Sequence, residues 1–229
     1  MSYLNEVIFG YYPYFAFSVF LVGSLIRFDR DQYTWRSGSS QLLRKRQMVI
    51  GSNLFHIGIL CLFGGHFVGL LTPIFIFDAL GISHGQKQLI AVGAGGFFGI
   101  LCFVGLTMLL HRRLTDERIR ATSSAMDIFI QLMLWAQVVL GLATLPLSLG
   151  HTDGEMMVRF MNWAQHIVTF RPGAASFVAD VPGIFKAHLV IGMTMFLVFP
   201  FTRLVHVWSA PIWYVARRYQ VVRSRRKIG

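Results

Sequence analysis

Residues 51–73 read GSNLFHIGILCLFGGHFVGLLTP, an apolar run without a formally charged side chain that carries His56 and His66. A helix that crosses the hydrocarbon core of a bilayer needs about 20 mainly apolar residues, because it rises about 1.5 Å per residue through roughly 30 Å. Uncharged flanks extend this run to residues 47–77. An ionisable side chain inside such a span is costly and by default marks a functional site. The stretch therefore predicts a membrane-spanning helix with two functional histidines.

The composition extends this prediction to the whole chain. Its 229 residues are 55% hydrophobic and 14% charged, with a mean hydropathy of +0.57, which is typical of a polytopic membrane protein and not of a soluble domain. Four other segments are long and apolar enough to cross a bilayer: residues 7–26, 88–111, 128–150, and about 181 to beyond 207. We expect one all-α integral membrane domain, residues 1–229, with five transmembrane helices.

Blocks of basic residues predict the orientation of these helices. The formal net charge is +11, and the arginines and lysines gather in residues 27–46, 112–120 and 217–227, after the first, third and fifth expected spans. Blocks between apolar runs follow the positive-inside rule and do not form the continuous basic face of a nucleic-acid-binding protein. We therefore expect the N-terminus outside, the C-terminus in the cytoplasm, and no nucleic acid partner.

Four of the eight histidines lie inside expected spans, His56 and His66 in the second and His188 and His206 in the fifth. A single membrane histidine commonly does no more than hydrogen-bond to a neighbouring helix. Two pairs point instead to bis-histidine ligation of two haems, which favours electron transfer over oxygen binding because both axial positions are filled. The sequence has no Cys-x-x-Cys-His string for covalent attachment, so these would be haems b.

The course of the chain predicts which histidines pair. The second and fifth helices run antiparallel, so the first histidine of one helix should face the last of the other. His56 and His206 would then ligate a proximal haem near the cytoplasm, and His66 and His188 a distal haem near the outer face. At helical rise the histidines are separated by about 15 Å on the second helix and about 27 Å on the fifth. This mismatch requires a bend, and Pro200 predicts a kink in the fifth helix.

Other residues near the expected haems have two interpretations each. Arg112, Arg113 and Arg203 would reach the propionates of the cytoplasmic haem, although anchoring of helix ends is the commoner role of such arginines. Gly64 and Gly65 would leave room for a flat macrocycle, although glycines are equally common where two helices pack closely.

Five strings of the sequence are recognisable: DQYTWR (31–36), SNLFHIG (52–58), GHFVGLLTP (65–73), AHLVIGM (187–193) and FPFTRLVHVWS (199–209). Together they resemble the gamma subunit of bacterial membrane-bound respiratory nitrate reductase, and the likeness covers nearly the whole chain. The resemblance implies the same ligand pairs, His56 with His206 for the proximal haem b and His66 with His188 for the distal one.

The resemblance also implies a reaction. In that family the gamma subunit oxidises a membrane quinol, ubiquinol or menaquinol, at the periplasmic side of the bacterial inner membrane. The quinol site would be formed by Lys87, His66 and Gly65, because a cation there can hydrogen-bond a quinone oxygen; an ordinary interfacial lysine is the alternative. Electrons then pass through the distal and proximal haems to an iron–sulfur beta subunit and on to a molybdopterin alpha subunit, which reduces nitrate to nitrite. The implied assembly is a heterotrimer, single or dimerised, docked through the basic loops and the tail 217–227, which would also meet anionic lipid headgroups.

Two other functions stay open on the residues alone. The chain could be the cytochrome b subunit of another quinone-linked oxidoreductase, which reconstituted activity with nitrate would distinguish. It could also be a haem-free small transporter whose histidines bind a metal or relay protons. That function predicts no Soret band in the purified protein, whereas a dihaem cytochrome b predicts a b-type spectrum with two haems per chain.

Overall fold

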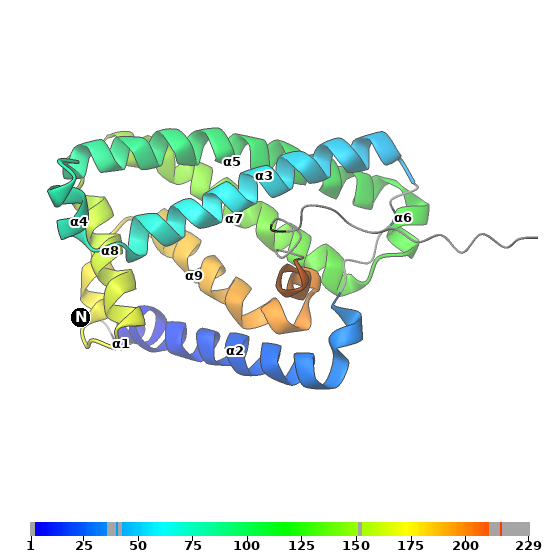
Figure 1. The fold of residues 1–229 in the computed structure, drawn as a ribbon, viewed down its shortest axis with the longest axis horizontal. Helices are drawn as coiled ribbons and strands as arrows, with labels where there is room; N and C mark the ends of the chain where they lie inside the picture. The colour runs from blue at the N-terminus through cyan, green and yellow to red at the C-terminus, as the bar shows by residue number, and fades with distance from the viewer. Residues whose placement is uncertain (1–2, 36–39, 41–42, 151–152, 211–215, 217–229) are drawn as a thin grey trace, which may run out of the picture.

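Five long helices form the body of the protein (Figure 1). The computed structural model describes residues 3–35, 40, 43–150, 153–210 and 216, so the expected docking tail 217–227 lies outside the described residues. Helices long and apolar enough to cross a membrane cover Tyr3–Thr34, Lys45–Leu71, His84–Thr115, Ala125–Leu149 and Gly183–Phe201. All regular structure in the described part of the chain is helical. The prediction of an all-α, multi-pass membrane protein with five spans is confirmed.

The spans are built from the following elements. The first comprises α1 (Tyr3–Glu6), a π-helical turn (Val7–Tyr11), α2 (Tyr12–Asp31) and a 3-10 turn (Gln32–Thr34). The later spans are α3 (Lys45–Leu71), α5 (His84–Thr115), α7 (Ala125–Leu149) and α9 (Gly183–Val198). Shorter elements are α4 (Ile74–Ala79), α6 (Glu117–Ala121), α8 (Glu155–Val168) and the 3-10 turns Ala174–Val178, Phe199–Phe201 and Arg203–Ser209.

The two ends of the bundle differ in character. Figure 1 shows α1, α4 and α8 at one end and α6 at the other. At the α6 end, Arg44 and Asp116 form an ion pair with an Nε–Oδ2 distance of 3.0 Å. The ion pair joins the basic connections that follow the first and third spans. Both connections therefore lie at the same end, as the positive-inside rule requires.

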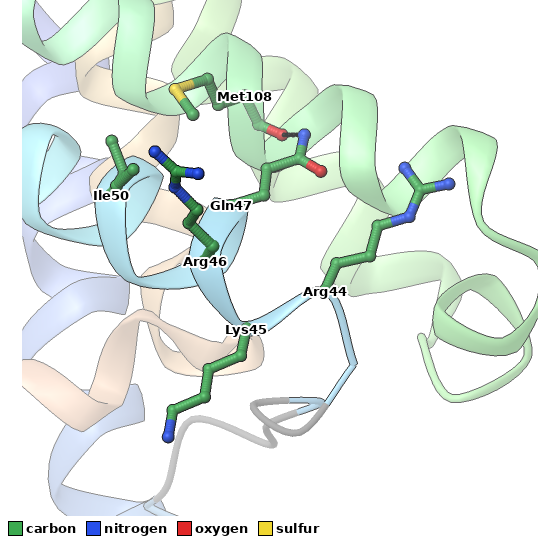
Figure 2. A pocket seen from close by; sticks show the side chains of 6 residues that line it. All are labelled: Arg44, Lys45, Arg46, Gln47, Ile50 and Met108. Carbon is green, nitrogen blue, oxygen red and sulfur yellow. Dashed lines mark hydrogen bonds between the residues drawn. The ribbon is translucent and has the colours of Figure 1, made fainter.

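A shallow hollow lies at this basic end, between the start of α3 and the end of α5 (Figure 2). Gln47, one of the residues that line it, donates to the Met108 carbonyl at 3.0 Å. Arg44, Lys45 and Arg46 line the rim, and Figure 2 shows that their side chains point in three different directions. The hollow is thus a cationic surface and not a site at which several cations converge on one anion.

Neighbouring spans pack in the order α3, α5, α7, α9 and α2, whereas α3 and α9 do not pack extensively against each other in the described part. Small residues allow α3 and α5 to approach closely. A Cβ atom added to Gly58 would lie 2.6 Å from the backbone nitrogen of Cys102. Because α3 presents this glycine face to α5, its histidines are left on the side that faces α9.

The second span is shorter than expected. Its helix ends at Leu71 and does not continue to residue 77, because Thr72 is extended and Pro73 follows it. Proline has no N–H to donate and disfavours the helical conformation of the residue before it. The remaining apolar residues form the separate helix α4.

The fifth span is interrupted at the proline for which a kink was predicted. Helix α9 ends at Val198, and Thr202 is extended with φ −116° and ψ 176°. His206 therefore lies in the next 3-10 turn, and the expectation of a continuous helix past residue 207 is wrong. Arg27 of α2 donates to the carbonyls of Pro200 and Thr202 at 2.6 and 3.0 Å. The arginine supplies the hydrogen bonds that the broken helix cannot supply to these carbonyls.

A second proline is accommodated in a similar way at the opposite end. Pro13 cannot donate to the carbonyl of Phe9, four residues earlier. The indole Nε1 of Trp163, on α8, donates to that carbonyl instead at 2.9 Å. The connection after the fourth span thus folds into a helix that packs into the core beneath the first span.

Candidate functional site

The four histidines that were predicted to lie in spans form two pairs, in which His56 and His66 of α3 face His206 and His188 of the segment 183–209. The imidazole centroids of His56 and His206 are 6.4 Å apart, and those of His66 and His188 are 6.1 Å apart. These are the partners expected from the antiparallel course of the two segments. The break after Val198 brings His206 back to the level of His56, which a straight helix would have overshot.

The spacing within each pair fits one metal ion held between two imidazoles. A metal–imidazole bond is about 2 Å long and the ring centroid lies about 1 Å behind the nitrogen, so two axial rings have centroids about 6 Å apart. In the described residues no three His, Cys, Asp or Glu side chains gather as a metal-binding group. The histidines are paired, and two imidazoles in such a pair could serve as the two axial ligands of one haem iron.

Three of the histidines are held by backbone carbonyls. The Nδ1 atoms lie 2.7 Å from the Ser52 carbonyl for His56, 2.7 Å from the Leu62 carbonyl for His66, and 2.6 Å from the Arg203 carbonyl for His206. A carbonyl only accepts, so Nδ1 carries the proton in each ring. The deprotonated Nε2 is then available to a metal, in the tautomer and orientation that second-sphere hydrogen bonds impose on histidine ligands.

The face of α3 that carries Gly64 and Gly65 is open. In the most apolar part of α3, whose mean hydropathy is 2.0, only 6% of the residues are buried inside the protein. The corresponding share for α5 is 22%. Nothing lies within 4 Å of a Cβ atom added to Gly64 or Gly65. His56 and His66 are exposed inside this apolar segment. Ionisable rings exposed on an apolar helix by default mark a functional site.

Lys87 is buried at the end of the bundle opposite the basic connections. Its side chain is 5% exposed and donates to the carbonyl of Gly69 at 3.0 Å and to the sulfur of Met161. The amine also lies 3.9 Å from the centroid of the Phe77 ring. Gly69 is one helical turn beyond His66, so the cation lies close to the level of the distal histidine pair.

The three arginines expected near haem propionates have protein partners. Arg112 is buried and donates to the carbonyls of Ser40 and Leu43, which fixes part of the connection before α3. Arg113 donates to the Ser123 hydroxyl at 2.7 Å. Arg203 lies 3.6 Å from the carboxylate of Asp127. These contacts link the helix ends to one another.

Sequence reasoning missed two contributions to the site. Gln137 lies 3.4 Å from the Nε2 atom of His188, and Gly141 makes room for the same ring. A polar glutamine in the middle of a span was the signal that could have identified the first. Nothing in the sequence indicated the glycine, because its role depends on the opposing helix.

Known proteins match this chain along almost its whole length. A model of the family described as nitrate reductase gamma subunit matches residues 5–225. The respiratory nitrate reductase 2 gamma chain of Escherichia coli (strain K12) is 53% identical over 226 residues, covering 99% of this chain and 100% of that protein. The respiratory nitrate reductase 1 gamma chain of the same organism is 50% identical, covering 98% and 100%. The nitrate reductase gamma chain of Bacillus subtilis (strain 168) is 41% identical, covering 96% and 99%.

Proposed function

Since the chain belongs to the nitrate reductase gamma subunit family, we propose that it is the dihaem cytochrome b subunit that oxidises membrane quinol for a respiratory nitrate reductase. A gamma chain is one subunit of a nitrate reductase complex. Its partners would be an iron–sulfur beta subunit and a molybdopterin alpha subunit that reduces nitrate to nitrite, in the bacterial inner membrane.

The observation that carries this proposal is the geometry of the two histidine pairs, with centroids 6.4 and 6.1 Å apart. His56 and His206 would hold a proximal haem b, and His66 and His188 a distal one. Bound in this way, two haems b would carry electrons one at a time through the apolar interior. The chain itself would contribute the axial nitrogens and, for His56, His66 and His206, their orientation through hydrogen bonds to backbone carbonyls.

Quinol would bind at the end of the bundle that holds Lys87, His66 and Gly65. Gly65 has no side chain between the distal site and an approaching ring, and nothing else lies within 4 Å of its Cβ direction. Lys87 Nζ would exchange the carbonyl of Gly69 for a quinol oxygen, whose developing negative charge a buried ammonium stabilises. Its present partners are a carbonyl and a thioether, both neutral acceptors that an anionic oxygen can displace.

This arrangement would separate charge across the membrane. Lys87 lies at the end opposite to Arg44 and Asp116, which by the positive-inside rule mark the cytoplasmic side. Protons released outside and electrons delivered inside would store about 2.3 kcal/mol per charge against 100 mV.

The test of the proposal is haem content in the complete complex, measured by its b-type absorption spectrum and redox titration. Replacing His56 or His206 with alanine is expected to remove one haem, with the same potential lost in both variants. Replacing His66 or His188 is expected to remove the other. His166, whose Nδ1 also bonds a carbonyl but which lies in α8 outside the spans, is the control and should retain two haems. A wild-type complex without a Soret band, or losses that group His56 with His66, would refute the assignment.

A separate experiment tests the quinol site. Lys87→Met is expected to lower quinol-driven nitrate reduction at least tenfold and to leave nitrate reduction by an artificial dye unchanged, because a dye can reduce the partner subunits directly. Lys186→Met is the matched control, since Lys186, in the first turn of α9, donates to the carbonyl of Ala179. Equal losses with both reductants would show that Lys87 serves assembly and not quinol oxidation.

A further inference from the structure

The ammonium of Lys87 is buried without a counterion among the described residues. None of the ion pairs in the described part of the chain includes it. The groups that contact it are neutral: the carbonyl of Gly69, the sulfur of Met161 and the ring of Phe77. A buried charge is costly unless it is paired or well hydrogen-bonded. These three groups therefore hold the ammonium in place.

The three neutral groups come from three different helices. Gly69 is on α3, Phe77 on α4 and Met161 on α8. Of the N–H donors of the ammonium, one goes to the carbonyl and one to the thioether, and the face of the aromatic ring attracts the cation. A thioether is a weak, polarizable acceptor. Unlike a carboxylate, it can orient an ammonium without neutralising the charge that a quinol oxygen would need.

The packing of α8 fixes the position of the Met161 sulfur. Met161 is 1% exposed. Two residues further along α8, the indole of Trp163 donates to the carbonyl of Phe9 in the first span at 2.9 Å. The amide of Gln165 donates to the carbonyl of Leu70, in the last turn of α3, at 3.1 Å. Because α8 is bonded both to the first span and to α3, the sulfur has a fixed place beside the end of α3.

We propose that Met161 is a positioning residue for quinol oxidation. Its sulfur, together with the ring of Phe77, holds the Nζ atom of Lys87 in place while the carbonyl of Gly69 is exchanged for a quinol oxygen. The inference rests on the proposed function, because it assumes that quinol binds at Lys87. Without the sulfur the long lysine side chain gains conformational freedom, and that freedom is lost again each time the ammonium meets the quinol oxygen.

The experiment combines Met161→Leu with Lys87→Met in the complete complex and measures kcat/KM for quinol in nitrate reduction. Leucine conserves the volume of methionine but accepts no hydrogen bond, so Met161→Leu is expected to lower kcat/KM about threefold to tenfold. In the Lys87→Met background the same substitution is expected to change kcat/KM less than about twofold, because the sulfur acts only through the ammonium. Met156→Leu is the matched control: Met156 is also on α8 and packs against the core, and its replacement should leave kcat/KM unchanged.

Each outcome decides the inference. A loss of kcat/KM that appears only when Lys87 is present, with haem content and dye-driven nitrate reduction unchanged, supports it. An unchanged kcat/KM, equal losses in both backgrounds, the same loss in Met156→Leu, or failure of Met161→Leu to assemble with two haems would overturn it. Unchanged quinol-driven activity in Lys87→Met alone would refute the proposed quinol site itself, which keeps the two failures distinguishable.

Discussion

Arg27→Leu is the substitution that tests most directly how the chain builds its proximal site. The guanidinium of Arg27 bridges α2 and the interrupted fifth span, with bonds of 2.6 and 3.0 Å to the carbonyls of Pro200 and Thr202. These carbonyls lie just before the 3-10 turn that carries His206. Leucine keeps the apolar contact of the side chain stem but leaves both carbonyls without the donor.

The size of the effect follows from these two bonds. A hydrogen bond to a charged group contributes about 1.5–3 kcal/mol, so the loss of both costs about 3 kcal/mol at the lower limit. At about 1.4 kcal/mol for each factor of ten, the arrangement that holds His206 opposite His56 becomes about a hundredfold less populated relative to open ones. We therefore expect substoichiometric proximal haem and normal distal haem.

The assay is haem content per complex, together with the potential of the haem that remains. Arg30→Leu is the control, because Arg30 lies one turn further along α2 and is exposed. Arg27→Lys should have an intermediate effect, since one ammonium cannot reproduce the geometry of a guanidinium fork. Two haems at full stoichiometry in Arg27→Leu would show that the break holds its shape without the arginine, and the reasoning would fail.

Three further predictions concern packing. Gly58→Leu should prevent stable accumulation of the subunit, because even its Cβ would lie 2.6 Å from a backbone nitrogen of α5, whereas Gly93→Leu, with nothing within 4 Å, should accumulate normally in membranes; equal amounts of both would contradict the packing argument. Trp163→Phe should lower the unfolding free energy by about 1–3 kcal/mol, seen as a lower midpoint of thermal unfolding, because the carbonyl of Phe9 loses its donor; an unchanged midpoint would mean that water or another group replaces the indole. Gly141→Val should reduce haem content from two to one by displacing the ring packed against it, and retention of both haems would show that the distal pair tolerates the shift.

Much of the fold and of the candidate site could be predicted from the sequence. Long apolar runs identify the spans, since hydropathy is a property of each segment by itself. The placement of His56 and His66 on one predicted span and His188 and His206 on another, together with the antiparallel course of these spans, was enough to predict which histidines lie together. These inferences need only local composition and the order of crossings.

Only the tertiary structure showed which groups donate hydrogen bonds to the backbone carbonyls left without a partner where the helices are interrupted. The carbonyl freed by Pro13 is bonded by a tryptophan 154 residues away, and the carbonyl of Pro200 by an arginine 173 residues away. Gln137 meets His188 only because glycines on both helices let them approach. A proline in the sequence predicts that a backbone carbonyl of the helix will lack its usual N–H donor. Which group donates to that carbonyl instead depends on which side chains lie near it in the folded protein. The reason is that a backbone carbonyl in an apolar surrounding must be bonded by whatever donor the packing brings within reach.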